Sequence, residues 1–99
     1  MSPITIYAGS ELSIYQVAAL KSDWWAQLSA EPIRLDLGDV SEIDGAGVQL
    51  TLALWRAAHL RGGGLSLVRV SDAAHEALSL VGASALLQTL TPAAEDEHA

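Results

Sequence analysis

The chain has 99 residues, a length typical of one domain with a single hydrophobic core, and it contains no cysteine, which excludes disulfides and thiolate chemistry. Its 12 acidic residues against 5 basic ones give a formal net charge of −7, and this balance disfavours nucleic acid and anionic membrane surfaces as partners. No apolar run approaches the roughly 20 residues that span a bilayer and no signal peptide is visible, so we expect a cytoplasmic protein with no direct membrane insertion.

The first third of the chain predicts two strands and a helix. Ile4–Tyr7 is short, β-branched and aromatic, and Glu11–Tyr15 follows it after Ala-Gly-Ser, so we predict two strands joined by a tight turn. From Gln16 the apolar residues recur at helical spacing. One stripe of this helix contains Val17, Leu20, Trp24 and Leu28. Trp24 is therefore expected in the core, and Trp25, about 100° away around the helix, at the edge of the buried face.

Strands and helices alternate in the middle of the chain. Ile33–Leu37 alternates apolar and charged residues, which is typical of a strand. Val48–Leu60 predicts a helix, which the glycines of Arg61–Gly64 are suited to end. Leu65–Val70 predicts the next strand.

Two more helices complete the predicted domain. Ser71 or Asp72 is expected to cap a helix that runs through Val81, and a short helix is expected over Ser84–Leu87. The order is then β-β-α-β-α-β-α-α, an α/β fold whose strand–helix–strand units imply parallel neighbours in a mixed β-sheet. Residues 1–91 are expected to form a single domain and residues 92–99 a flexible acidic tail.

The stretch SEIDGAGVQL, Ser41–Leu50, carries the most specific pattern. Asp44 stands where an N-cap side chain accepts hydrogen bonds from the first free N–H groups of a helix. Two glycines follow it, and small residues there suggest that the helix start lies close to a neighbour; we assign this role to Gly45. The helix itself has leucines on both sides. Either it packs deep in the core, or it keeps one apolar strip for a partner.

This region, from LDLGDVSEIDGAGVQL through LSLVRV to LVGASALL, resembles the STAS domain, the family of bacterial anti-sigma factor antagonists. The resemblance covers roughly residues 4–90 and implies a mixed sheet with helices packed chiefly on one face. It also implies binding rather than catalysis. The implied partner is a kinase-like anti-sigma factor of the GHKL type or a chemotaxis signalling protein, or alternatively the ATPase of an ABC-type lipid transporter, for which the chain is an accessory subunit.

In that family the hydroxyl residue directly after the aspartate is the phosphorylation switch. Here this position is Gly45, and the next, often a second serine, is Ala46. The resemblance thus implies a partner-binding surface without the usual phosphoacceptor; Ser41 and Thr51 are weak candidates for a replacement. The expected partner-binding residues are Asp44, Gly45, Ala46, Gly47, Gln49, Leu52, Ala53 and Arg56.

Three other groups of residues bear on metal, phosphate or catalytic chemistry. The acidic residues Asp36, Asp39, Glu42 and Asp44 suggest a cation site only if their oxygens converge, which strand alternation disfavours. The glycines of Arg61–Gly64 follow a helix rather than precede one, so a phosphate-binding loop is not expected. His59, His75 and His98 lack partners at metal-ligand spacing. We therefore expect no metal, no cofactor and no enzyme; a small-ligand or nucleotide binder stays an alternative.

Overall fold

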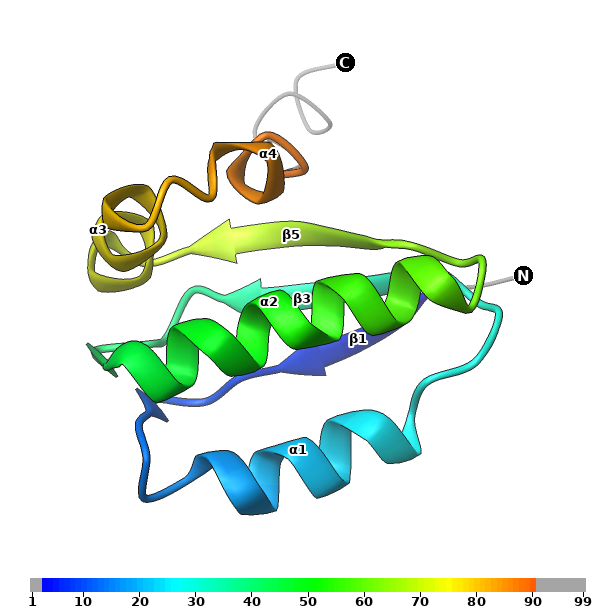
Figure 1. The fold of residues 1–99 in the computed structure, drawn as a ribbon, viewed down its shortest axis with the longest axis horizontal. Coiled ribbons are helices and arrows are strands. Elements are labelled where there is room, and N and C mark those ends of the chain that lie inside the picture. The colour runs from blue at the N-terminus through cyan, green and yellow to red at the C-terminus, as the bar shows by residue number, and fades with distance from the viewer. Residues whose placement is uncertain (1–2, 91–99) are drawn as a thin grey trace.

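Three parallel strands form the main sheet, in the order β1-β3-β5 (Figure 1). They are β1 (Ile4–Tyr7), β3 (Ile33–Leu37) and β5 (Leu65–Val70). The computed structural model describes residues 3–90, so the predicted tail, 92–99, lies outside the described residues. The α/β class is confirmed, although each strand pair in the described part is parallel, where we expected a mixed sheet.

A second, two-stranded sheet pairs β2 (Glu11–Leu12) with β4 (Glu42–Ile43). The sequence-based prediction missed β4 and was wrong about the tight turn, because β2 pairs with β4 and not with β1. The expected strand over Glu11–Tyr15 ends early for a local reason. The N–H groups of Gln16 and Val17 both donate to the carbonyl of Ser13, which turns the chain toward the first helix.

Four helices complete the fold. They are α1 (Val17–Ala26), α2 (Gly45–Leu60), α3 (Asp72–Leu80) and α4 (Ser84–Leu87). In Figure 1, α2 lies in front of the main sheet, α1 lies on the side of β1, and α3 and α4 lie beyond β5. None of the helices within residues 3–90 has the length and apolar character needed to cross a bilayer.

The two faces of the main sheet differ in chemistry. One face carries buried aliphatic residues, such as Ile6, Leu35 and Leu67, which join the core with residues of α2. The other face carries polar or exposed side chains, such as Tyr7 and Arg34. The α2 helix therefore packs on the apolar face of the main sheet and not on the polar face.

The predicted burial of the two tryptophans and the predicted cap of α3 are confirmed. Trp24 is 1% exposed in the core, and Trp25 is half-buried with the Lys21 ammonium 5.3 Å from its ring centroid. Ser71 caps α3 by accepting a hydrogen bond from the Ala74 N–H (3.1 Å). The α2 helix begins at Gly45, directly after the predicted cap Asp44 and three residues before the predicted segment Val48–Leu60.

Candidate functional site

The Asp44 carboxylate joins two distant segments at the start of α2. One oxygen, Oδ1, accepts a hydrogen bond from the Gly47 N–H (3.0 Å), as an N-cap does. The other, Oδ2, accepts one from the Ile14 N–H (2.9 Å). These hydrogen bonds lower the pKa of Asp44 below its ordinary value, and the hydrogen bond from Ile14 has the largest effect. The predicted cap is confirmed, and the same side chain also holds the β2–α1 turn in place.

Two apolar residues that the sequence-based prediction placed in a strand stand exposed beside this helix start. Ile14 is 60% exposed and Tyr15 is 86% exposed, and both lie in the turn that Asp44 anchors. The turn is fixed by Ser13, whose Oγ accepts a hydrogen bond from the Tyr15 N–H (3.3 Å). Ser13, four residues before the first residue of the helical stripe, Val17, was the available signal for this turn.

The close approach at the start of α2 occurs at Gly47 and not at Gly45, so that part of the prediction was wrong. A Cβ added to Gly47 would lie 2.0 Å from the carbonyl oxygen of Leu12, in β2. A Cβ added to Gly45 would meet nothing within 4 Å. The reason is helical phase: Gly47 faces the core and is buried, whereas Gly45 is exposed.

The α2 helix has one buried face and one accessible face. Leu50, Thr51, Leu54 and Ala58 are buried. On the other side Gln49, Ala53 and Arg56 are exposed and Leu52 is half-buried. Of the eight predicted partner-binding residues, only Gly47 lies on the buried face. We call the accessible side, from Gly45 to Arg56, the outer face of α2.

Two shallow hollows border this outer face. One, of about 270 Å³, lies between α1 and α2 and is lined by Val17, Ala18, Lys21, Ala46, Gln49, Leu50 and Ala53. The other, of about 490 Å³, is lined by Leu52, Trp55, Arg56 and His59. Trp55 and His59 were not among the predicted site residues. They line the same hollow as Leu52 and Arg56 because residues spaced i, i+3, i+4 and i+7 share one side of a helix. The hollows combine apolar surface with isolated cations.

The two candidate replacement phosphoacceptors have different environments. Thr51 is fully buried, and its Oγ1 donates a hydrogen bond to the carbonyl of Gly47 (2.9 Å). A kinase therefore has no access to it in the folded chain. Ser41 is exposed, and its Oγ donates to the carbonyl of Ser10 (3.2 Å).

The acidic residues singled out in the sequence have separate roles. Asp36 accepts hydrogen bonds from Arg69 Nε (3.0 Å), and Asp39 lies 3.4 Å from the same guanidinium. The Asp36 carboxylate raises the pKa of Arg69. Asp44 caps α2 instead. Within residues 3–90 no group of three or more histidine, aspartate or glutamate side chains is arranged to hold a metal ion.

Comparison with protein families places the fold described above in a known family. The family model described as "Mlab, STAS domain" matches residues 2–94. No sequence among curated proteins matches the chain.

Proposed function

The chain belongs to the STAS domain family, and from this premise we propose that it is a non-catalytic, cytoplasmic binding module that docks a kinase-like or other signalling partner through the start and outer face of α2. STAS domains are generally regulatory modules that interact with proteins.

The accessible apolar surface around Asp44 is the observation that carries this proposal. Ile14 and Tyr15 expose apolar side chains on one side of the helix start, and Leu52 and Trp55 line a hollow further along α2. Ile14 and Tyr15 are exposed, and Leu52 and Trp55 are half-buried. Accessible apolar residues gathered around one helix are more typical of an interaction site than of a free surface. Arg56, which is exposed and lines the same hollow as Leu52 and Trp55, supplies a charge that orients a partner.

The absence of a hydroxyl at Gly45 supports constitutive binding. A phosphate added at this position would bring roughly −1.5 to −2 charges beside Asp44 and a bound partner. Glycine offers no acceptor, so the module keeps its binding-competent form. This feature also favours the second candidate function, an accessory subunit on the ATPase of an ABC-type transporter, because a permanent subunit needs no release switch.

Coexpression with the products of neighbouring genes tests the function and separates the two candidates. Stable copurification with a kinase-like or chemotaxis protein supports the first, and copurification with a transporter ATPase supports the second. No complex with any of these classes would refute both.

Charge reversal on the outer face tests the surface. Arg56→Glu should weaken the copurified complex about tenfold or more, as expected when the charge of an interface arginine is reversed. The matched control is Arg34→Glu, which makes the same change in net charge at an exposed position on the polar face of the sheet. Equal effects of the two variants would mean that net charge, and not the outer face of α2, governs binding.

Restoring the hydroxyl tests the missing switch. Gly45→Ser should fold as well as the wild type, because a Cβ there has open space. Incubated with a cognate kinase and ATP, the wild type should gain no phosphate at this position, whereas Gly45→Ser should gain one and release its partner. Phosphate on Ser41 of the wild type, with loss of the partner, would show that the acceptor has moved; intact mass and peptide mass spectrometry distinguish these results.

A further inference from the structure

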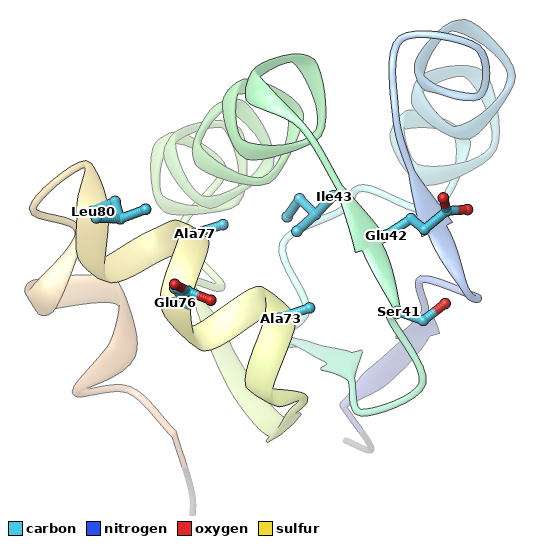
Figure 2. A pocket seen from close by; sticks show the side chains of 7 residues that line it. All are labelled: Ser41, Glu42, Ile43, Ala73, Glu76, Ala77 and Leu80. Atoms are coloured by element: carbon cyan, nitrogen blue, oxygen red, sulfur yellow. The ribbon is translucent and has the colours of Figure 1, made fainter.

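A third hollow lies on the far side of β4 from β2. It has a volume of about 410 Å³ and runs between β4 and α3 (Figure 2). Its lining is Ser41, Glu42, Ile43, Ala73, Glu76, Ala77 and Leu80. In Figure 2, the Ile43 side chain points from β4 toward α3, where Ala77 faces it. We call this hollow the α3–β4 groove.

The α3 helix presents two apolar stripes, one in the core and one along the groove. Ala74 and Leu78 are buried in the core. Ala73, Ala77 and Leu80 recur at i, i+4 and i+7 and line the groove, and Ala77 also packs against the core. Leu80 is 80% exposed, at one end of the groove. Leu80 is therefore apolar surface at the end of the stripe that a binding partner can bury.

The charges at the groove have one sign. Glu76 projects from the α3 wall, and Glu42 lies on the β4 strand on the opposite side from Ile43; both are exposed. Lysine and arginine are absent from its lining. The basic side chains of the described chain lie elsewhere: Lys21 stacks on Trp25, for example, and Arg69 pairs with Asp36. An apolar floor with the Glu76 carboxylate at its border and no basic side chain in its lining complements an aliphatic side chain flanked by lysine or arginine.

The groove is continuous with the start of α2. Ile43, which forms its β4 wall, directly precedes the capping residue Asp44. The groove therefore begins one residue before the cap of α2, so a partner that contacts Asp44 lies close to it.

We propose that the α3–β4 groove binds a protein segment in which an aliphatic anchor is flanked by lysine or arginine, and that this segment belongs to the partner held by the outer face of α2. The inference rests on the proposed function for the identity of the segment's owner. Its chemistry rests on the groove alone: Ile43, Ala77 and Leu80 take the anchor, and Glu76 on the α3 wall faces the cations.

A defined probe tests the chemistry without the partner. The probe is a synthetic 14-residue peptide with leucines at helical spacing flanked by lysines, titrated into the full chain and followed by amide chemical shifts. We expect shift changes at Ile43 and along α3. Leu80→Ser should weaken binding roughly ten- to a hundredfold, the scale for losing one buried leucine, and Glu76→Lys should also weaken it.

Matched controls exclude general stickiness. Leu60→Ser removes an equally exposed leucine, at the end of α2, and Asp23→Lys makes the same charge reversal on α1; neither should change peptide affinity. Peptides with glutamate in place of lysine, or serine in place of leucine, should not bind. Shift changes that avoid α3, or equal losses in test and control variants, would overturn the proposal.

The copurified partner provides the second test. Loss of the complex in Arg56→Glu but not in Leu80→Ser or Glu76→Lys would overturn the groove proposal and leave the proposed function standing. Failure to find any partner, with the peptide still bound at the groove, would overturn the proposed function alone. Concentration-dependent self-association that Leu80→Ser abolishes would assign the groove to a second copy of the chain and overturn the proposal.

Discussion

Adding one methyl group at Gly47 should destabilise the chain, although alanine is the better helix former. Gly47 lies in the first turn of α2, directly against the backbone of β2. A Cβ there would lie 2.0 Å from the Leu12 carbonyl oxygen and 2.7 Å from the Leu12 carbonyl carbon. Neither backbone can yield cheaply, because β2 is paired with β4 and α2 is packed on the core.

Two opposed effects decide the size of the change. Replacing glycine by alanine inside a helix contributes about 1 kcal/mol in favour of folding. Overpacking a close contact costs about 1–3 kcal/mol. The upper end applies because the two atoms nearest to the added Cβ, the carbonyl oxygen and carbon of Leu12, belong to the backbone. The net loss should therefore be about 2 kcal/mol. In a domain of this size that loss lowers Tm by about 8–16 °C.

Urea denaturation followed by far-UV circular dichroism measures this loss, with Gly45→Ala as the matched control. A Cβ at Gly45 meets nothing within 4 Å, so the control should equal or slightly exceed the wild type in its midpoint. The slope of ΔG against urea should stay constant in all three chains, since the fold is the same. A Gly47→Ala midpoint at or above that of the wild type would refute the close packing of α2 on β2.

Two further predictions concern the core and the cap. Trp24→Ala should cost about 3–5 kcal/mol, because it empties a large buried site, and Trp25→Ala should cost less; equal losses in urea denaturation would contradict the helical phase of α1. The lowered pKa of Asp44 means that its ionised form stabilises the fold above about pH 4 and that this contribution is lost as pH falls through the folded-state pKa. Asp44→Asn, which does not titrate, should therefore lose less Tm than the wild type between about pH 4 and about pH 2 by calorimetry, and parallel Tm curves would contradict the hydrogen bonds from Ile14 and Gly47.

Local patterns predicted the long elements because their residues have one strong periodicity each. The stripe that includes Trp24 predicted α1, and the alternation of Ile33–Leu37 predicted β3. The cap at Asp44 was also predictable, since an aspartate before a helix has few other favourable roles.

Features that depend on distant neighbours were not predictable from these patterns. β4 has two residues, and it exists because β2 lies beside it. Which of two glycines makes the close contact depends on where Leu12 lies, which the sequence SEIDGAGVQL does not contain. Leu12, Ser13 and Ile14 alternate between apolar and polar as strand residues do, and the turn at Ser13 overrides that alternation.

The parallel pairing of the strands also governs how the chain folds as it is synthesised. Ile4 pairs with Ile33, Ile33 with Leu65, and Glu11 with Glu42. Each ladder therefore needs a long loop to close, which slows folding relative to hairpin-rich or helical chains of the same length. On the ribosome, β1 has no strand to pair with until β3 has emerged, and β3 lacks its second neighbour until β5 has emerged. The nascent chain thus carries unpaired strand edges through most of its synthesis, and chaperone dependence should fall sharply once Val70 is exposed.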